Sequence, residues 1–484
     1  MNAIDQKLYN VAVIGAGTAG LVTAAGTAAL GGCVALIERN KMGGDCLNFG
    51  CVPSKALISS ARLIQQIRES EKWGLDRQEP RFVFERVFER MRARRAKIAP
   101  NDSQDRLESL GVDVFRGEAH FVSPHEIEVD GQRLRAKNFV IATGSRAAIP
   151  KIEGIDHVPF FTNETIFDEL KQMPERMIVL GGGPIGCELG QVLARLGVKV
   201  TILQRASQLL PREDSDVAEF LQRQLEHEDV RIEFGAEAKS VARQDNSVRL
   251  NCLRKDGSGF QLNADALLVA AGRVPSIDKL NLNAGGVRFN ERGVIVNEYL
   301  QTSQPHIYAA GDIAGSFQFT HLADAHARVV VRNILMPLQL LRQKTETAVL
   351  PWVTYTDPEI AHVGFGEKEA KHKNVQYDLF VVALEEVDRA VVESEEAGFA
   401  KILTVKGSDK ILGVTIVGAR AGDLIHEFVL AMKAGIGLGA IASTIHAYPT
   451  FAELARKAGD KYNRTRLTPR AKKVFTWLYK RARR

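Results

Sequence analysis

The spacing of apolar and polar positions repeats once along the chain. Near residues 9–38 and again near 177–203, a short apolar run leads into a glycine-rich turn, a helical segment and a second apolar run. Apolar runs of this length, joined through a helix, are typical of parallel strands buried on both faces. The pattern predicts two βαβ units, with strands at 9–14 and 34–38 in the first and at 177–180 and 199–203 in the second.

The remaining segments add to both units and then change in character. Helical spacing predicts helices at 19–30, 55–68 and 82–98, and shorter apolar runs predict strands within 111–140 and at 139–144, 266–271, 294–296 and 307–310. From Leu350, alternating strands at 377–383, 400–405 and 411–417 precede helices at 421–433 and from Thr450. The predicted fold class is α/β, with two Rossmann-like nucleotide-binding domains followed by an α+β C-terminal domain.

Charge is distributed unevenly along the 484 residues. Ten Lys and Arg residues and no Asp or Glu occupy 461–484, so 54 basic residues face 58 acidic ones in the rest of the chain, although the whole carries +6. A mildly acidic body with a basic tail does not indicate a nucleic-acid enzyme.

Two further features bear on where the protein works. Residues 11–37 carry no charge, but they contain six glycines and a turn signature, which argues against a membrane span or signal peptide. Five cysteines, an odd number, argue against a disulfide scaffold and favour a reducing compartment, so we expect a cytoplasmic location.

The first glycine-rich turn predicts a nucleotide site. Gly15, Gly17 and Gly20 follow a strand and open a helix, where glycines let the backbone approach a pyrophosphate. Glu38 ends the next strand and can accept hydrogen bonds from a ribose diol.

The second turn, with Gly181, Gly183 and Gly186, predicts another nucleotide site. Here Gln204 and Arg205 stand where an NAD enzyme usually has an acid. A guanidinium can pair with a 2′-phosphate, so Arg205 favours NADPH over NADH. The alternative is that Arg205 is a solvated residue at a strand end.

The segment 43–55 carries the redox chemistry. Cys46 and Cys51 lack the two further ligands that a zinc site needs, and we expect no bound metal. A helix start can lower a thiol pKa, which suits a redox-active disulfide. Cys33, Cys187 and Cys252 have no partner and are interpreted as packing residues.

With this segment, a series of motifs resembles the pyridine-nucleotide disulfide oxidoreductases, which include dihydrolipoamide dehydrogenase, glutathione reductase and mercuric reductase. The resemblance covers about residues 8–460. Besides the two turns and the cysteine segment, it rests on Ala142-Thr143-Gly144, Ala271-Gly272-Arg273-Val274-Pro275, Tyr308-Ala309-Ala310-Gly311-Asp312 and Asp357-Pro358-Glu359-Ile360-Ala361.

The resemblance implies roles for these residues. FAD would lie on the first turn and Glu38, with Asp312 on its ribityl chain, and NADPH or NADH would lie on the second turn. Thr143, Gly144 and Gly272 would also line cofactor sites. Lys55 would pair with Glu188 beside the flavin, Cys51 would face the flavin as a thiolate, and Cys46 would exchange with the acceptor.

The resemblance also implies the domain plan. It predicts an FAD-binding domain (1–148 and 272–348), an NAD(P)-binding domain (149–271), a dimerisation domain (349–460) and a basic tail (461–484). In the implied homodimer, Cys46 and Cys51 of one subunit meet Tyr448 and Glu453 of the other.

One position departs from the pattern of the disulfide-reducing members. The residue before Pro449 is their catalytic histidine, but here it is Tyr448, with Glu453 retained. Because tyrosine has an ordinary pKa near ~10, it is a poor base at neutral pH. His446 stands two residues early, which favours a structural role.

Mercuric reductases also carry a tyrosine at this position. However, they have a C-terminal cysteine pair and many have an N-terminal metal-binding domain, whereas this sequence shows neither. Three hypotheses follow. The first is a mercuric-reductase-like enzyme acting on a metal ion or another soft small-molecule acceptor. The second is a dihydrolipoamide dehydrogenase-type enzyme.

The third hypothesis is a flavoprotein that feeds electrons to a membrane partner. The tail mixes basic residues with Phe475, Trp477 and Tyr479, a composition that suits contact with a membrane surface or membrane protein. A solvated helix or a disordered end is the alternative. Peripheral membrane association is thus an expectation added to the cytoplasmic one.

Overall fold

The computed structural model describes residues 7–245, 247–315, 317–336 and 338–483. Residues 1–6 of the predicted FAD-binding domain and Arg484 of the basic tail lie outside the described residues, as do residues 246, 316 and 337. Contacts divide the chain into two compact units. One comprises Met1–Ile64, Pro80–Ser207 and Glu228–Thr345, and the other Gln65–Glu79, Gln208–His227 and Glu346–Arg484.

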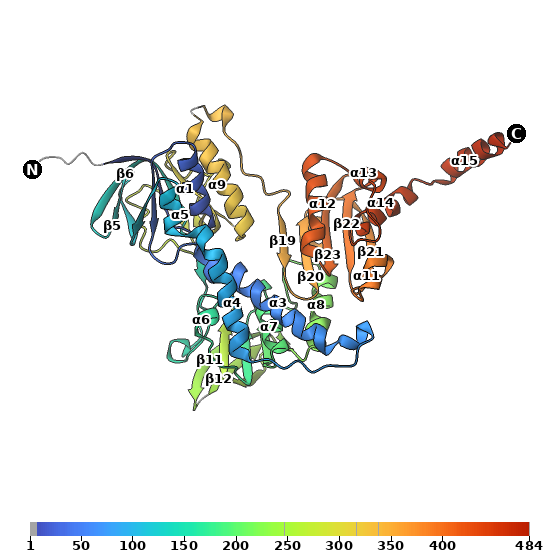
Figure 1. Ribbon diagram of the computed structural model, residues 1–484, viewed down its shortest axis with the longest axis horizontal. Helices are drawn as coiled ribbons and strands as arrows, with labels where there is room; N and C mark the ends of the chain where they lie inside the picture. The colour runs from blue at the N-terminus through green and yellow to red at the C-terminus, as the bar shows by residue number, and fades with distance from the viewer. Residues whose placement is uncertain (1–6, 246, 316, 337, 484) are drawn as a thin grey trace, which may run out of the picture. The chain divides into compact units, whose positions relative to one another are not determined.

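The first unit contains the predicted FAD-type sheet. Its seven strands run in the order β3-β2-β1-β6-β5-β4, with β18 also paired to β6. They are β1 (Leu8–Ile14), β2 (Val34–Glu38), β3 (Val112–Arg116), β4 (Ala119–Ser123), β5 (Glu126–Val129), β6 (Gln132–Ile141) and β18 (Ile307–Ala309). β1 pairs in parallel with β2 and β6, as the apolar runs predict. Helices α1 (Thr18–Ala29) and α9 (Thr320–Leu335) pack side by side (Figure 1).

The same unit contains the second nucleotide-type sheet. Four parallel strands run in the order β10-β9-β8-β14, namely β8 (Arg176–Leu180), β9 (Lys199–Gln204), β10 (Arg231–Phe234) and β14 (Ala266–Val269). α7 (Pro184–Arg195) connects β8 to β9. An antiparallel sheet of β11 (Ala236–Gln244), β12 (Ser247–Arg254) and β13 (Gly259–Ala264) lies outside the predicted elements.

The chain around these sheets forms two short strand pairs and five further helices. The pairs are β7 (Ser145–Ala147) with β15 (Arg273–Pro275) and β16 (Phe289–Asn290) with β17 (Gly293–Val294). The helices are α2 (Gly44–Asn48), α3 (Cys51–Arg68), α4 (Phe84–Ile98), α5 (Gln104–Ser109) and α6 (Ile166–Glu169). Thus α3 begins four residues before the predicted start at Lys55, and the strand predicted at 294–296 is only the two-residue β17.

The second unit contains the predicted α+β domain. Its antiparallel sheet runs β19-β20-β23-β22-β21, with β19 (Pro351–Thr354), β20 (Glu359–Gly364), β21 (Tyr377–Ala383), β22 (Phe399–Val405) and β23 (Ile411–Gly418). Its helices are α8 (Ser215–His227), α10 (Glu367–His372), α11 (Asp388–Val392), α12 (Ala421–Ala434), α13 (Leu438–Ser443), α14 (Glu453–Thr465) and α15 (Pro469–Ala482).

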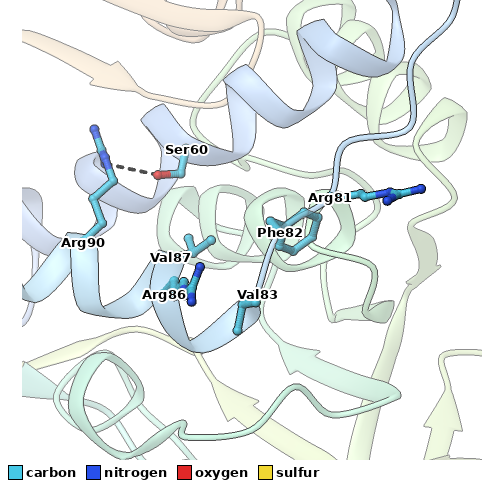
Figure 2. Close-up of a pocket in the computed structure, with 7 residues that line it drawn as sticks. All are labelled: Ser60, Arg81, Phe82, Val83, Arg86, Val87 and Arg90. Carbon is cyan, nitrogen blue, oxygen red and sulfur yellow. Dashed lines mark hydrogen bonds between the residues drawn. The ribbon is translucent and has the colours of Figure 1, made fainter.

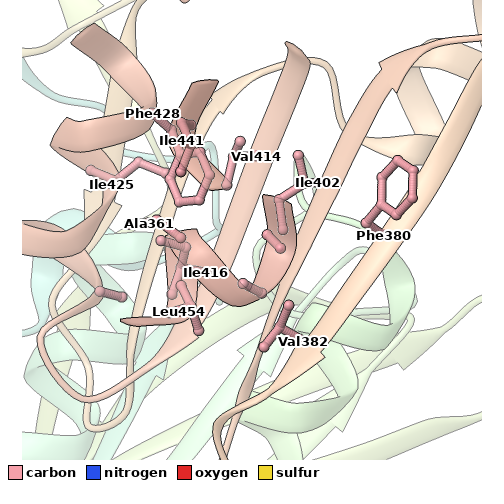
Figure 3. Packing of buried hydrophobic residues seen from close by; sticks show 14 of the residues in the cluster. Ala361, Phe380, Val382, Ile402, Val414, Ile416, Ile425, Phe428, Ile441 and Leu454 are labelled. Atoms are coloured by element: carbon pink, nitrogen blue, oxygen red, sulfur yellow. The ribbon is translucent and has the colours of Figure 1, made fainter. Parts of the chain in front are cut away.

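The core of this unit lies between the sheet and its helices. Phe428 of α12 is fully buried and belongs to one cluster with Ile416 of β23 and Leu454 of α14 (Figure 3). Alternate residues of β22 and β23 belong to this cluster, and most of the residues between them are buried as well, so both faces of these two strands are covered. Within the described part of the chain, no helix is both long and apolar enough to cross a membrane.

Candidate active site

The first glycine-rich turn has the close backbone packing that a dinucleotide turn needs. A Cβ added to Gly20 would lie 1.8 Å from the Gly15 oxygen, so only glycine fits there. A Cβ on Gly17, in contrast, would meet nothing nearer than 3.9 Å. The N-terminus of α1 is therefore open to an anionic group, as the pyrophosphate of FAD requires.

Glu38 lies beside this turn at the end of β2. Its side chain is buried, and its two carboxylate oxygens accept hydrogen bonds from the backbone N–H groups of Ala16 and Asn40, each at 2.6 Å. Each oxygen can accept a further bond. The turn and Glu38 together fit the pyrophosphate and a ribose of FAD.

The second turn repeats the geometry with a different acceptor. A Cβ on Gly186 would lie 1.9 Å from the Gly181 oxygen, whereas one on Gly183 would meet nothing within 4 Å. The Gln204 side-chain oxygen accepts from the Gly182 N–H at 3.2 Å, just as Glu38 accepts from Ala16. An amide thus replaces the carboxylate, and the next residue, Arg205, is exposed.

The redox segment packs directly on the first turn. The Gly43 N–H donates to the Ala16 oxygen at 3.0 Å, and a Cβ on Gly44 would lie 2.6 Å from the Gly17 Cα. Gly44 also has a φ of +55°, which favours glycine. This contact fixes α2, which carries Cys46, and leads into α3, whose first residue is Cys51.

The two thiols differ in their electrostatic surroundings. A hydrogen bond from the Cys46 thiol, together with a bond to Thr320 and the charge of Lys55, lowers the pKa of Cys51 to about 6. Partial desolvation of this exposed residue and the charge of Glu188 oppose the shift. The pKa of Cys46 is raised by the same hydrogen bond and by burial. In the dithiol form, Cys51 is therefore the thiolate and Cys46 the thiol at neutral pH.

Thr320 is the residue of this site that the sequence did not reveal. Its hydroxyl lies 3.5 Å from the Cys51 sulfur and belongs to the first residue of α9. The start of a helix adds partial positive charge near a thiolate. Thr320 and Cys51 are 269 residues apart, so no local spacing indicates this contact, and α9 was not among the predicted elements.

Lys55 and Glu188 meet as the resemblance implies. The Lys55 Nζ lies 2.8 Å from the Glu188 Oε2, and the exposed fractions of the two side chains are 32% and 7%. Lys55 is one helical turn after Cys51 on α3, and Glu188 lies on α7. The pair therefore connects the cysteine helix to the helix that follows the second glycine turn.

The other predicted cofactor residues gather around the β7–β15 pair. Thr143 Oγ1 donates to the Ser276 oxygen at 2.9 Å, and the Gly144 oxygen accepts from the Ser276 N–H at 2.9 Å. The Gly272 oxygen accepts from the Ala148 N–H, also at 2.9 Å. These bonds join residues 143–148 to residues 272–276, the two segments in which the chain passes between the FAD-type sheet and the second sheet.

Asp312 is connected to the redox segment through Arg273. Ser145 donates its hydroxyl hydrogen to Asp312 and accepts from the Arg273 Nε at 2.8 Å. The same guanidinium lies 3.2 Å from an Asp45 oxygen. Burial raises the pKa of Asp45 in spite of Arg273. The network was not predicted, although Asp45 and Arg273 both stand in motifs that the sequence displays.

Tyr448 belongs to the second unit and is held as a hydrogen-bond donor. Its hydroxyl donates to the Asp388 Oδ2 at 3.0 Å, and this bond raises the pKa of Tyr448 above its usual value of 10. The phenol is therefore not available as a base at neutral pH. Asp388 could not be inferred from the sequence, because it lies 60 residues away in α11.

Two neighbours of Tyr448 complete this region. His446 is paired at both ring nitrogens, with the Glu427 Oε1 at 2.9 Å and the Thr444 oxygen at 3.0 Å, which agrees with a structural histidine. Glu453 is only 3% exposed. One of its oxygens accepts from Arg456 at 2.8 Å, and the other has no hydrogen-bond partner.

The remaining cysteines lie outside the redox centre. Cys187 and Cys252 are buried, and burial raises the pKa of both thiols, in Cys252 to about 11. These two are packing residues, as predicted, whereas Cys33 is only half-buried. In the described ranges, no three His, Cys, Asp or Glu side chains gather into a group that could hold a metal ion.

A separate hollow lies beside α3 and α4 (Figure 2). Its volume is about 410 Å³, and its lining residues are Ser60, Arg81, Phe82, Val83, Arg86, Val87 and Arg90. Arg90 donates to the Ser60 hydroxyl at 3.1 Å. Ser60 follows Cys51 by nine residues, about two and a half turns, so it lies on the opposite face of α3. The hollow is therefore not the redox site.

Comparison with known families identifies the chain's relatives. The family model for pyridine nucleotide-disulphide oxidoreductases matches residues 9–327, and the model for their dimerisation domain matches residues 350–458. The chain belongs to the pyridine nucleotide-disulphide oxidoreductases. This oxidoreductase is thus an FAD- and NAD(P)H-dependent enzyme with a disulfide redox centre, and its dimerisation domain supports a homodimer.

Two kinds of curated relative resemble this oxidoreductase equally well. Mercuric reductase of Lysinibacillus sphaericus is 34% identical over 451 residues, covering 93% of this chain and 82% of the relative. Dihydrolipoyl dehydrogenase of Geobacillus stearothermophilus is 33% identical over 454 residues, covering 93% and 95%. Sequence identity therefore confirms the family and leaves the acceptor open.

A solved structure has the same fold. It is the Cu(II) complex of the HOCl-induced flavoprotein disulfide reductase RclA from Escherichia coli, with a TM-score of 0.84 and 27% identity. The match covers 94% of this chain and 99% of RclA. The predicted fold class, two nucleotide-binding domains plus an α+β dimerisation domain, is confirmed.

Proposed function

We propose that this oxidoreductase passes electrons from NADPH through FAD and the Cys46–Cys51 pair to a soft metal ion or a similar non-disulfide acceptor. The observation that carries the proposal is the state of Tyr448. It occupies the place of a base, yet it donates to Asp388 and has a raised pKa. The second candidate, a disulfide or dithiol oxidoreductase, needs a group there that takes up and releases a proton near neutral pH.

We also propose the domain plan given by the resemblance. Residues 1–148 and 272–348 would bind FAD, 149–271 would bind NAD(P), 349–460 would form the dimer contact and 461–484 would be a separate tail. Gly15, Gly17, Gly20, Glu38, Thr143, Gly144, Gly272 and Asp312 are assigned to FAD or its surroundings, and Gly181, Gly183, Gly186 and Arg205 to NADPH.

Bound FAD supplies a two-electron relay between the nicotinamide and the cysteine pair. The protein itself supplies a charged pair close to the cysteines. Lys55, paired with Glu188 at 2.8 Å, places a cation one helical turn after Cys51. Two electrons would break the Cys46–Cys51 S–S bond, leaving Cys51 as a thiolate and, after uptake of one proton, Cys46 as the thiol that meets the acceptor.

The proton balance separates the two candidate acceptors. Reduction of Hg(II) by NADPH yields NADP⁺, elemental mercury and one released proton, so no proton needs to be delivered to a leaving group. Reduction of a disulfide yields NADP⁺ and two thiols and consumes one proton from solution. The departing sulfur then depends on a nearby acid. A phenol held by Asp388 suits the first reaction better.

Thiolate ligands also favour a soft metal ion. The relatives agree with this class of acceptor, because they include mercuric reductases and an RclA structure solved with Cu(II). The equally similar dihydrolipoyl dehydrogenase keeps the dithiol reaction as the second candidate.

The third hypothesis, electron transfer to a membrane partner, concerns where the acceptor is located. The tail lies beyond residue 458, where the matched dimerisation domain ends, and the redox residues all lie before it. Tail docking can therefore accompany either acceptor and replaces neither.

The test is NADPH oxidation by the FAD-loaded homodimer with Hg(II) in excess thiol and, separately, with lipoamide. We expect metal-dependent turnover to exceed lipoamide turnover by roughly a hundredfold. Cys46→Ser should abolish acceptor turnover yet still allow NADPH to reduce the bound flavin. Strong lipoamide turnover with little metal-dependent oxidation would establish the second candidate instead.

A further inference from the structure

The tail forms a helix that the family fold does not account for. The dimerisation-domain match ends at residue 458, whereas α15 spans Pro469–Ala482. Its start is well defined, because the Thr468 hydroxyl accepts from the Ala471 N–H at 3.2 Å and Pro469 occupies the first helical position. Within its own unit, α15 extends beyond α14 at the C-terminal end of the chain (Figure 1).

The apolar side chains of α15 gather on one face. At 100° per residue, Val474, Leu478 and Phe475 fall within an arc of about 100°, and Tyr479 extends it to roughly 140°. None of the helix is buried, and the exposed fractions of Val474, Phe475, Leu478 and Tyr479 lie between 47% and 70%. The face is therefore uncovered in the chain itself.

Basic residues surround this apolar face. Lys473 and Lys480 lie on the opposite side of α15, Arg470, Lys472 and Arg481 lie along the two edges of the face, and the helix contains no acidic residue. The Arg481 guanidinium lies over the Trp477 ring, 5.6 Å from its centroid. An apolar face bordered by basic side chains along both edges, with aromatic residues close to those edges, is the pattern of a helix that lies in the plane of a membrane interface.

We propose that α15 binds the surface of a bilayer rich in anionic phospholipid. The basic side chains that flank the apolar face would pair with lipid phosphates, and the apolar face would insert among the acyl chains. Pairing with α15 of a second copy would bring five like charges together on each side, and binding to a nucleic acid would leave the apolar face in water. The charge and the exposed apolar face together therefore favour lipid.

This inference goes beyond the proposed function and does not depend on the acceptor. Every residue assigned to the redox site lies outside α15, so substitutions in the helix should leave NADPH oxidation in solution unchanged. Loss of lipid binding and loss of catalysis can therefore be distinguished in the same preparation.

The experiment is flotation of the FAD-loaded full-length protein with vesicles of phosphatidylcholine alone or mixed with phosphatidylglycerol. We expect at least about tenfold stronger binding to the anionic vesicles at low salt, weakening as salt is added. Two variants test the two faces, one with Lys472, Lys473 and Lys480 changed to Glu and one with Phe475 and Leu478 changed to Ser. Each should lose most of the binding.

The matched control places three charge reversals on another exposed basic surface, at Arg86, Arg94 and Lys97 of α4. This variant should float like the unaltered protein. Equal binding to both vesicle types, full binding by either α15 variant, or an equal loss in the α4 control would overturn the proposal. So would flotation that requires an added acidic protein or nucleic acid.

Discussion

At the scale of single residues, the chemistry depends on how the Cys51 sulfur is surrounded. Three groups favour its thiolate, namely the Cys46 thiol, the Thr320 hydroxyl and the Lys55 ammonium. They come from three different helices, α2, α9 and α3. Because the pKa of Cys51 lies below its ordinary value, the thiolate is present above about pH 6 and is lost as the pH falls through that value.

The pH dependence can be measured directly. In FAD-loaded Cys46→Ser protein, where a serine hydroxyl can still donate to Cys51, the thiolate–flavin absorbance band should rise with pH. We expect a midpoint well below 8, since the unperturbed thiol has a pKa of about 8.5. A midpoint at or above that value would contradict the assigned environment of Cys51.

Thr320 should contribute a measurable part of this shift. Thr320→Val removes the hydroxyl at nearly constant volume, and a lost hydrogen bond to a charged group corresponds to a rise of about one pKa unit. The same absorbance titration gives the result. Thr320→Ser, the matched control, should titrate like the unaltered protein, and an unchanged midpoint in the valine variant would show that the 3.5 Å contact has no effect on the thiolate.

The site residues that could be predicted from the sequence lie close together along the chain, and those that could not lie far apart. Cys46, Cys51 and Lys55 lie within ten positions of one another, so their spacing alone indicates shared chemistry. Thr320 lies 269 residues from Cys51, and no local pattern connects them. The contact of Asp388 with Tyr448 and the lack of a partner for one Glu453 oxygen likewise result from tertiary packing, which the spacing of residues along the chain does not indicate.

At the scale of elements, the two glycine turns are structural copies with different strand ends. Glu38 ends β2 and Gln204 ends β9, and each accepts from a backbone N–H of its own turn. At the end of β9 an amide replaces the carboxylate, and Arg205 follows it. This strand end would not repel a 2′-phosphate, which supports the expected preference for NADPH.

The coenzyme preference should depend on Arg205. Arg205→Ala should lower kcat/KM for NADPH by about tenfold or more, with little change for NADH, because only NADPH carries the 2′-phosphate. Lys199→Ala, at the exposed opposite end of β9, is the control and should alter neither. Equal losses with both coenzymes would mean that Arg205 acts on the fold instead of the phosphate.

The strands with strong apolar patterns were predicted correctly, whereas one antiparallel sheet and the start of α3 were not. The strands of both βαβ units and the strand at 377–383 occur where the pattern places them, within a residue or two. The antiparallel strands β11–β13 were not predicted, although β12 alternates clearly, with Val248, Leu250 and Cys252 buried between more exposed positions, so the sequence did carry a period-two signal there. α3 begins at Cys51, four residues before the predicted start. Its first turn contains Pro53, which a helix tolerates only near its N-terminus, so the proline argues against a helix until the start is known.

At the scale of the whole molecule, the family assignment supports a homodimer and two bound cofactors. Tyr448 and Glu453 belong to a different compact unit from Cys46 and Cys51. The proposal that they meet between subunits rests on the family resemblance, and no feature of one chain's sequence could have supplied it. The predicted domain boundaries remain a proposal for the same reason.

A shared site can be tested with mixed dimers. Once Cys46→Ser and Tyr448→Arg homodimers are each found inactive, differently tagged chains carrying one substitution each are purified as a heterodimer. If the site joins two subunits, one of the two sites is intact and about half of the activity returns. The control pairs a doubly substituted chain with an unaltered one and should be inactive. The reverse pattern would place each site within a single chain.

We propose that Tyr448 directs the enzyme away from disulfide chemistry, and acceptor turnover by Tyr448→His beside the unaltered protein tests this role. A histidine there could meet the unpaired Glu453 oxygen and act as a base at neutral pH. We predict that lipoamide turnover rises by about a hundredfold while Hg(II)-dependent NADPH oxidation falls. High lipoamide turnover by the unaltered protein, or no rise in the variant, would rule out this role for Tyr448.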